Sequence, residues 1–259
     1  MDQLSNYKKH EHNIWIYISD IMSGLMLIFL FISILYMHQI SKDKKKIEDI
    51  NHRIKKIANA YKSLHDQLYE ELLNEFQDDL KEWNAIVKPK DIEIWFKEPK
   101  VLFKDGDDKL RPKFKTILDS FFPRYLNKLM SETYINDIEE VRIEGYTSSD
   151  WYNEKDKIIC YIENMKLSQR RTRNVLEYIL QLPNIKNDET KFQWLKNKLT
   201  ANGLSSSKLQ YIKNLTGEKI EDKIASRRVV FKIRTNAEKR IKEILKSGCL
   251  EWEDVENCE

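Results

Sequence analysis

Residues 21–37 read IMSGLMLIFLFISILYM, a run of 17 positions without a charged side chain. As a helix, the apolar stretch from Ile14 to Met37 is about 36 Å long at about 1.5 Å per residue, which is enough to cross a bilayer. A cleaved signal peptide is disfavoured because such peptides have shorter apolar runs and end in a small-x-small site. The sequence therefore predicts one transmembrane helix at residues 14–40.

The 259-residue chain as a whole has the composition of a soluble protein, with 34% charged residues. Its 45 basic residues against 42 acidic ones give a net charge of +3, which is too small to indicate nucleic-acid binding. The sequence contains no Cys-x-x-Cys pair, histidine cluster, glycine-rich phosphate loop or nucleophile–base pair. We therefore expect no metal, no cofactor and no enzymatic activity.

The three cysteines are Cys160, Cys249 and Cys258. Cys249 and Cys258 lie close together near the C-terminus, and they would form a disulfide if that end is extracytoplasmic. Cys160 would then remain a free thiol.

Residues 41–90 are predicted to form a helical connector. Its apolar positions, spaced alternately three and four apart, make a coiled-coil seam. The seam consists of Ile47, Ile50, Ile54, Ile57, Tyr61, Leu64 and Leu68. From Leu68 to Leu80 the steps change to four, as at a stutter. The pattern favours pairing with a second copy of the chain, and the alternative is a helix that packs on its own globular domain.

Residues 91–236 alternate between strand and helix patterns, which predicts an α+β sandwich with helices on one face of a mixed sheet. The tail at 237–259 has a helical composition. The expected strands are 92–96, 101–103, 141–147, 208–213 and 227–235, and the expected helices begin near Pro112, near Leu167 and at Glu189. Residues 148–163 read as an irregular insertion, and Asn202–Gly203 reads as the end of the third helix.

Asp20 is the exceptional residue of the predicted membrane span. An ionisable residue in a bilayer is costly and marks a functional site by default. Ser23 and Gly24 share its helix face and permit close packing of partner helices. A headgroup position for Asp20 is the alternative, but Trp15 and Tyr17 precede it, and such rings favour the interface. A single helix cannot form a channel, so the hypothesis requires partner helices.

The stretch NIWIYISDIMSGLMLIFLFISIL resembles the transmembrane segment of the MotB-like stator subunits. In that family an Asp, followed closely by Met and a small residue, carries the transported ion. The resemblance implies that Asp20 and Ser23 serve ion translocation, with H⁺ expected by analogy and Na⁺ left open.

The C-terminal part resembles the OmpA-like peptidoglycan-binding fold over residues 91–236. Four stretches carry the resemblance: VLFKDGDDKLRP, IEGYTSS, ENMKLSQRRTRNVLEYIL and SRRVVFKIR. It implies that Thr147, Asn164, Leu167 and Arg171 shape the pocket for the peptidoglycan stem peptide.

Within that pocket, Arg171 is expected to form a bidentate pair with a ligand carboxylate. Ser168 is expected to cap the helix whose N-terminus favours an anion. The family usually has Asp directly after Gly-Tyr-Thr, where it pairs with the ligand's ammonium. This chain has Ser148 there and Asp150 two residues later, which leaves its affinity for the cell wall and its ligand preference open.

The charge pattern and the family resemblance indicate opposite orientations of the chain in the membrane. Four lysines in 42–46 would weakly place the C-terminal side in the cytoplasm. The resemblance instead implies a cytoplasmic N-terminus at residues 1–13, a periplasmic C-terminal domain and a location in the inner membrane, because peptidoglycan lies outside that membrane.

Taken together, the resemblance implies a proton-driven stator subunit that forms a homodimer inside a ring of a multispan, MotA-like partner and is anchored to peptidoglycan. Within the family, the MotB-like subunits of Zorya anti-phage systems are the nearer match, and flagellar stator subunits are the alternative. A passive OmpA-like wall tether and a TolR/ExbD-type accessory protein are the remaining interpretations.

Overall fold

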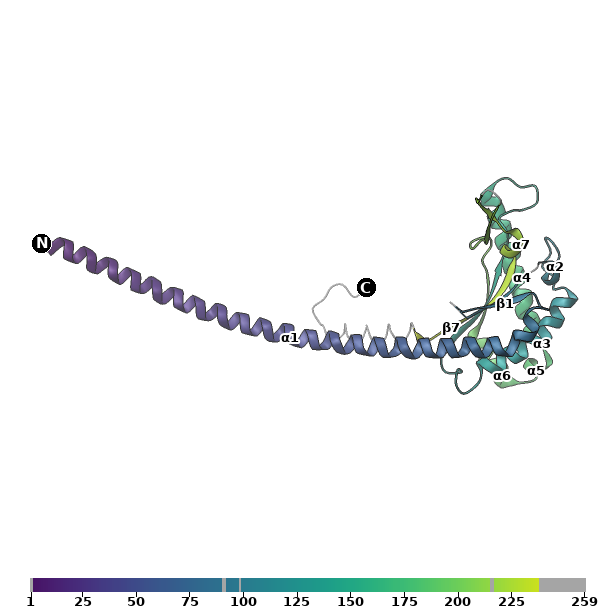
Figure 1. Ribbon diagram of the computed structural model, residues 1–259, viewed down its shortest axis with the longest axis horizontal. Coiled ribbons are helices and arrows are strands. Elements are labelled where there is room, and N and C mark those ends of the chain that lie inside the picture. The colour runs from purple at the N-terminus through teal and green to yellow at the C-terminus, as the bar shows by residue number, and fades with distance from the viewer. Residues whose placement is uncertain (1, 90–91, 98, 215–216, 238–259) are drawn as a thin grey trace. The chain divides into compact units, whose positions relative to one another are not determined.

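The computed structural model describes residues 2–89, 92–97, 99–214 and 217–237, and the chain divides into two compact units (Figure 1). One unit holds residues 1–56 and 241–259, and the other holds residues 57–240. Helix α1 (Asp2–Leu80) begins in the first unit and ends in the second. The expected continuous helix through the membrane span and into the connector is therefore confirmed, while Cys249 and Cys258 lie outside the described residues.

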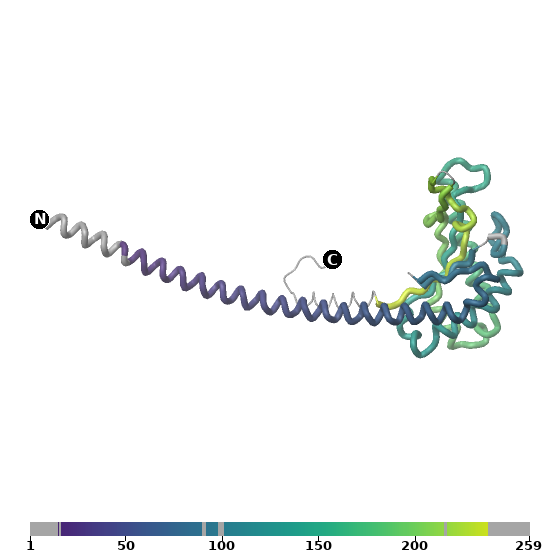
Figure 2. Tube along the Cα trace, in the orientation of Figure 1, coloured from purple at the N-terminus to yellow at the C-terminus, as the bar shows by residue number. Residues whose placement is uncertain are grey.

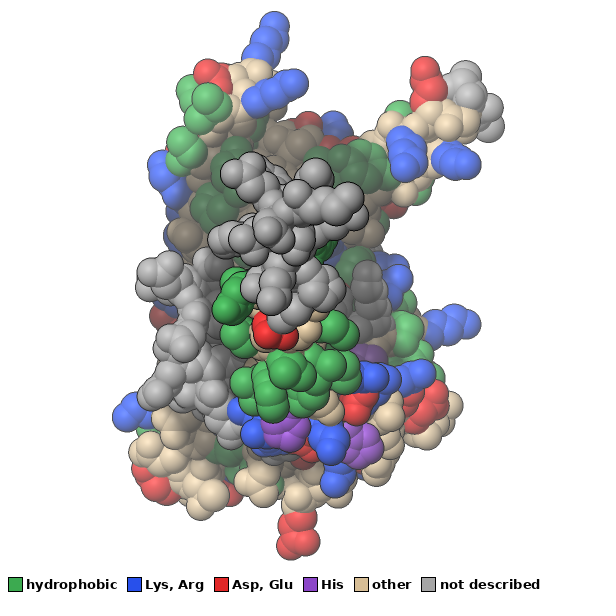
Figure 3. Space-filling view, turned by 90° about the vertical axis from the view of Figure 1, so that its left-hand side faces the viewer, with side chains coloured by type: hydrophobic (Ala, Val, Ile, Leu, Met, Phe, Trp, Pro, Cys, Tyr) green, Lys and Arg blue, Asp and Glu red, His purple; other side chains and the backbone are tan. Residues whose placement is uncertain are grey.

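From Tyr17 to Ile40, α1 is a continuous and largely apolar stretch of helix (Figure 2), and the side chains of this stretch are exposed. Among the described residues it is the one helix long and apolar enough to cross a membrane. The large hydrophobic side chains from Ile21 to Met37 are 46–70% exposed. Figure 3, which views this end of the molecule, shows hydrophobic side chains gathered into a continuous surface. Such a surface is compatible with a lipid environment.

The second unit contains a five-stranded mixed sheet of order β1-β2-β7-β3-β4, in which β3 and β4 are parallel and the other neighbours antiparallel. A separate two-stranded ribbon pairs β5 with β6. The strands are β1 (Ala85–Lys88), β2 (Glu93–Phe96), β3 (Ile138–Tyr146), β4 (Leu199–Gly203), β5 (Tyr211–Lys213), β6 (Lys219–Glu221) and β7 (Arg228–Thr235). The helices after α1 are α2 (Pro99–Leu102), α3 (Pro112–Leu129), α4 (Lys157–Leu180), α5 (Pro183–Lys186), α6 (Glu189–Lys198) and α7 (Lys223–Ser226).

The hydrophobic core lies on one face of this sheet. Phe121 of α3 packs against Phe96 of β2 and Phe231 of β7, with ring centroids 5.0 and 5.1 Å apart. Val175 and Ile179 of α4 belong to the same buried cluster. The alternate strand positions carry mostly charged side chains, together with Trp95, Tyr146 and Val230, and the expected mixed sheet with helices on one face is confirmed.

The end of α1 differs from the predicted connector. The helix stops at Leu80, and residues 85–88 form the edge strand β1, so the expected helical connector to residue 90 is wrong over its last ten residues. Leu68, Leu72 and Phe76 are fully buried in the core of the same chain. The steps of four after Leu68 keep these side chains on the stripe that faces the domain. Here the alternative of packing on its own domain is correct.

Three further local predictions are corrected. Residues 101–103 do not form a strand, because Pro99 starts the short helix α2 and Phe103 makes only an isolated bridge to Leu110. The insertion ends earlier than expected, since the Asp156 carboxylate caps the nitrogens of Ile158 and Ile159 and starts α4 at Lys157.

The stretch expected to close the third helix is instead strand β4, which pairs in parallel with β3. Its five residues include Asn202 and Gly203, types that are depleted in strands, so local propensity conceals it. Gly203 is required there because a Cβ atom would lie 2.3 Å from the backbone nitrogen of Gln169 on α4.

Candidate functional site

A cleft of about 180 Å³ lies where β3 ends beside α4 and α7. The structure brings all four predicted peptidoglycan-binding residues together at this cleft. Thr147 follows β3 directly, whereas Asn164, Leu167 and Arg171 share one face of α4 at positions i, i+3 and i+7. The complete lining is Asp105, Gly106, Thr147, Ser148, Asp150, Trp151, Tyr152, Asn164, Leu167, Arg171, Lys223 and Arg227.

The cleft depends on a close approach of α4 to the ends of β3 and β4. A Cβ atom at Gly145 would lie 2.7 Å from Thr172 Cγ2, and the carbonyl of Ser168 is 3.1 Å from the same position. The Thr172 hydroxyl donates to the carbonyls of Ser168 and Gln169 and is fully buried. These contacts fix the height of α4 above the sheet and so the position of the cleft residues that it carries.

Arg171 is 7% exposed and is already bound to the chain itself. Its Nε donates to the carbonyl of Asp107 at 2.8 Å, and its Nη2 donates to the carbonyl of Lys104 at 3.0 Å. The guanidinium also lies 4.7 Å from the centroid of the Phe103 ring. Two of the five guanidinium N–H donors are thus used inside the chain, and the expected bidentate pair with a ligand carboxylate, which needs the remaining N–H groups of Nη1 and Nη2, stays a prediction.

The charge of Arg171 persists at neutral pH. Burial lowers the pKa of its guanidinium to about 10, and the nearby positive charge of Arg227 acts in the same direction. A pKa of about 10 still leaves the group cationic near pH 7. Arg171 thus places one buried positive charge beside the cleft while its other nitrogens hold the 104–107 loop.

Asn164 and Thr147 both line the cleft, but they differ in their hydrogen bonds. Asn164 Nδ2 donates to the carbonyl of Asp150 at 2.8 Å and so fixes the loop after β3. Thr147 is 3% exposed, and its hydroxyl has no hydrogen-bond partner in the described part of the chain. A buried hydroxyl without a partner is costly, so Thr147 offers a hydrogen bond to a molecule in the cleft.

Ser168 does not cap α4, which corrects a further expectation. It lies in the middle of the helix, donates to the carbonyl of Met165 at 2.9 Å and accepts from the backbone nitrogen of Ser205 at 3.1 Å. The N-terminus of α4 is capped by Asp156, more than two turns earlier. The positive charge at this cleft is therefore that of side chains and not of the N-terminus of α4.

Asp20 and Ser23 lie on the exposed apolar part of α1. The Ser23 hydroxyl donates to the carbonyl of Ser19 at 2.8 Å, and a Cβ atom at Gly24 would meet nothing within 4 Å. Among the described residues, no hydrogen bond or ion pair involves the Asp20 carboxylate. An ionised carboxylate in lipid needs partners, so the isolated chain does not complete this site.

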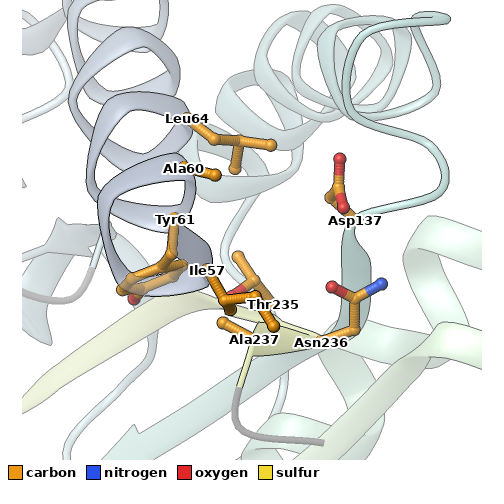
Figure 4. A pocket seen from close by; sticks show the side chains of 8 residues that line it. All are labelled: Ile57, Ala60, Tyr61, Leu64, Asp137, Thr235, Asn236 and Ala237. Carbon is orange, nitrogen blue, oxygen red and sulfur yellow. The ribbon is translucent and has the colours of Figure 1, made fainter. Parts of the chain in front are cut away.

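A second cavity of about 110 Å³ lies between α1 and the end of β7 (Figure 4). Ile57, Ala60 and Leu64 line its α1 side, and Asp137 is the only charged residue of its lining. The figure shows the polar side chains of Asp137 and Asn236 on the side opposite the helix. Four of its eight lining residues are aliphatic and one is charged, and this lining does not mark the cavity as a ligand site. Cys160, which was expected to be free, is a buried free thiol whose Sγ contacts the carbonyl of Glu154.

Comparison with known proteins adds a relative of nearly equal length. The Zorya protein ZorB of Escherichia coli (strain ATCC 8739) is 46% identical over 238 residues, which cover 92% of this chain and 94% of that protein. The chain belongs to the ZorB family. No family model matches it.

Solved structures resemble parts of this ZorB-family chain. A putative MotB-like protein from Desulfovibrio vulgaris is 20% identical, with a TM-score of 0.44 over 67% of this chain and 96% of that one. The cell wall anchor of the Pseudomonas aeruginosa type VI secretion system (T6SS) is 18% identical, with a TM-score of 0.41 over 63% of this chain and 96% of that one. The periplasmic domain of Helicobacter pylori MotB is 13% identical, with a TM-score of 0.39 over 63% and 89% of the two chains.

Three charged cleft residues of this ZorB-family chain were not identified from the sequence. Asp105 lies in the glycine turn before α3, and Lys223 and Arg227 lie in and just after α7. Asp105 belongs to a stretch that the sequence marks as a turn, but no local pattern marks the two cations. They reach the cleft only because β7 brings the chain back beside β3.

Proposed function

We propose that this ZorB-family chain is the wall-anchored stator subunit of an ion-driven membrane complex in Zorya anti-phage defence. The observation that carries the proposal is the 46% identity to ZorB over 92% of the chain, together with Asp20 on an apolar helix of spanning length. Two copies pair through their membrane helices and the exposed part of the α1 seam, inside a ring of a multispan, MotA-like partner.

In this proposal H⁺ binds to and leaves Asp20 as it moves down its gradient. Each elementary charge gains about 2.3 kcal/mol per 100 mV of membrane potential. Ser23 and Gly24 lie within one turn of Asp20 and leave room for a partner helix and for water. The change of charge at a desolvated site biases the surrounding ring to step. No bond-making chemistry is involved, so the chain is not an enzyme.

The cleft beside α4 holds the dimer to peptidoglycan. Support comes from the four residues that converge on it and from the buried Thr147 hydroxyl without a partner. This role requires an inner-membrane location with the N-terminus in the cytoplasm and residues 57–237 in the periplasm. A topology reporter fused after residue 259 should therefore read periplasmic, and a cytoplasmic reading contradicts the proposal.

The ion-carrying role is tested with Asp20→Asn in vesicles that contain the chain and the membrane protein that co-purifies with it. We expect proton flux and phage protection to be lost while the protein level stays normal, because asparagine cannot carry a proton charge. Asp43→Asn is the matched control, since Asp43 lies on the same helix beyond the apolar run and accepts from Gln39. Unchanged flux and protection in Asp20→Asn would instead favour a passive tether.

A further inference from the structure

Two cations from one short segment pair with two carboxylates across the cleft. Lys223 at the start of α7 forms an ion pair with Asp150 in the loop after β3. Arg227 directly follows α7, and its Nη1 lies 3.1 Å from Oδ1 of Asp105 in the turn before α3. One carboxylate belongs to the turn before α3 and the other to the loop after β3, whereas both cations belong to the segment 221–227, which contains α7 (Figure 1).

The segment 221–227 is held in place independently of these pairs. The Asp222 carboxylate accepts from the nitrogens of Ile224 and Ala225 at 3.0 and 2.9 Å and so caps α7. Glu221 accepts from both the backbone nitrogen and the hydroxyl of Ser149. Lys223 is thus presented to Asp150 by a defined turn.

Asp150, two residues beyond Ser148, is the lining carboxylate in the loop after β3, and Lys223 already pairs with it. Asp150 lines the cleft, and its side chain is 49% exposed, while that of Lys223 is 54% exposed. The hydrogen bond from Lys223 to Asp150, with the attraction between their charges, raises the pKa of the Lys223 ammonium. Lys223 therefore remains cationic throughout the neutral range. Exposed ion pairs are weak, so a ligand cation can compete with it.

The charges around the cleft otherwise favour an anionic ligand. Its lining contains three cations, Arg171, Lys223 and Arg227, against two carboxylates, Asp105 and Asp150. Both carboxylates have a cation of the chain itself as partner. A ligand carboxylate therefore meets an excess of positive charge, whereas a ligand ammonium meets carboxylates that are already neutralised.

We propose that Lys223 is a specificity-determining residue of the cleft, whose ammonium competes at Asp150 with the ammonium of a peptide ligand. The cleft accordingly selects peptides by their carboxylate and gains little from a free side-chain amine. This inference rests on the proposed binding of peptidoglycan by the same cleft, and it adds which stem-peptide chemistry the cleft prefers.

The test uses isothermal titration calorimetry on the full-length chain in detergent micelles. The two probes are the tripeptide L-Ala–γ-D-Glu–meso-diaminopimelate with its free side-chain amine and the same tripeptide with that amine acetylated. The wild-type chain should bind both peptides with similar affinity. Lys223→Met should bind the free-amine peptide about fivefold more tightly and leave the affinity for the acetylated peptide unchanged.

The controls separate the ion pair from other effects of the substitution. Adding Asp150→Asn to Lys223→Met should abolish the gain, because no carboxylate is then left for the ligand amine. Lys223→Arg keeps the pair and should behave as the wild type. Lys213→Met, which removes an exposed lysine on β5 outside the cleft lining, should change neither affinity.

Two results would overturn the inference in different ways. If both peptides bind but the ratio of their affinities is the same in the wild type and in Lys223→Met, Lys223 does not determine specificity, and the proposed function stands. If neither peptide binds to any folded variant, as judged by circular dichroism, the proposed peptidoglycan binding fails and the inference fails with it.

Discussion

Arg124 of α3 donates a hydrogen bond of 2.6 Å from Nη1 to the Asp79 carboxylate on the last turn of α1. The same guanidinium donates from Nε to Glu75 at 2.8 Å and from Nη2 to the Glu75 carbonyl. It also lies 4.9 Å from the ring centroid of Phe76. This side chain thus joins the last turns of α1 to α3, beside the buried contacts that Leu68, Leu72 and Phe76 make with the domain core.

Arg124→Ala should loosen this junction. The Arg124 side chain is 37% exposed, so solvent screening reduces the gain, and we expect a loss of about 1 kcal/mol in the free energy of unfolding. Chemical denaturation of the detergent-solubilised chain measures it. Arg173→Ala serves as the control, because its pair with Glu177 is 65% and 60% exposed and should contribute almost nothing. Equal effects of the two substitutions would contradict a special role for Arg124.

Phe76→Ala should destabilise the C-terminal domain although Phe76 belongs to the helix that starts in the other unit. The Phe76 side chain is fully buried, and its ring centroid lies 5.1 Å from that of Phe121. The cavity that alanine would leave should lower the free energy of unfolding by about 3–5 kcal/mol. The readout is again the free energy of unfolding. Ile47→Ala, at a position that is 48% exposed on the same helix, should leave domain stability unchanged. A small effect of Phe76→Ala would mean that α1 is separable from the domain.

Gly24→Leu should report partner helices around Asp20. Within the chain the new side chain meets nothing within 4 Å, so the helix itself tolerates it. If partner helices pack on this face, proton flux should fall at least tenfold in vesicles with the partner protein. Ser33→Leu is the matched control, because nine positions at about 100° per residue place Ser33 on the opposite side of the helix. Normal flux in Gly24→Leu would place the partner helices elsewhere.

Gly203→Ala should disturb the cleft through the backbone. A Cβ atom at Gly203 would lie 2.3 Å from the nitrogen of Gln169, so α4 and β4 must move apart at a cost of about 1–3 kcal/mol. We expect a lower melting temperature together with weaker retention on isolated peptidoglycan sacculi. Gly217→Ala is the control without a steric clash, because a Cβ atom at Gly217 would meet nothing within 4 Å, although the positive φ of this residue adds local strain. Unchanged retention in Gly203→Ala would separate the cleft from wall binding.

Arg171→Lys should reduce retention on sacculi while most of the fold persists. A lysine keeps the charge, but its single ammonium cannot donate to the carbonyls of Asp107 and Lys104 and also bind a ligand in the cleft. We expect at least tenfold weaker retention, compared at equal folded protein by circular dichroism. Arg170→Lys, next to it and paired with Asp108 outside the cleft lining, should retain binding. Full retention by Arg171→Lys would exclude a role for the guanidinium.

Features carried by one local pattern were predicted well. The strand at Ile92–Phe96, the helix start at Pro112 and the closing strand after Arg227 agree with the structure, because each depends on its own periodicity or on a proline. β4 and the first ten residues of α4 were missed. Pairing with β3 overrides the poor strand propensity of Asn202 and Gly203, and the Asp156 cap begins α4 within a stretch that has no clear apolar stripe.

The sequence by itself determined the apolar helix with Asp20, the polar and apolar faces of the sheet, and the family to which the chain belongs. These depend on residue type and spacing within short segments, where one residue's neighbours are known from the chain order. Only the tertiary structure decided that α1 ends inside the domain core, that Arg171 is bound by the 104–107 loop and that Lys223 pairs with Asp150. Each of these depends on side chains from distant segments that meet only after packing, and the energies that hold them depend on burial and distance rather than on local pattern.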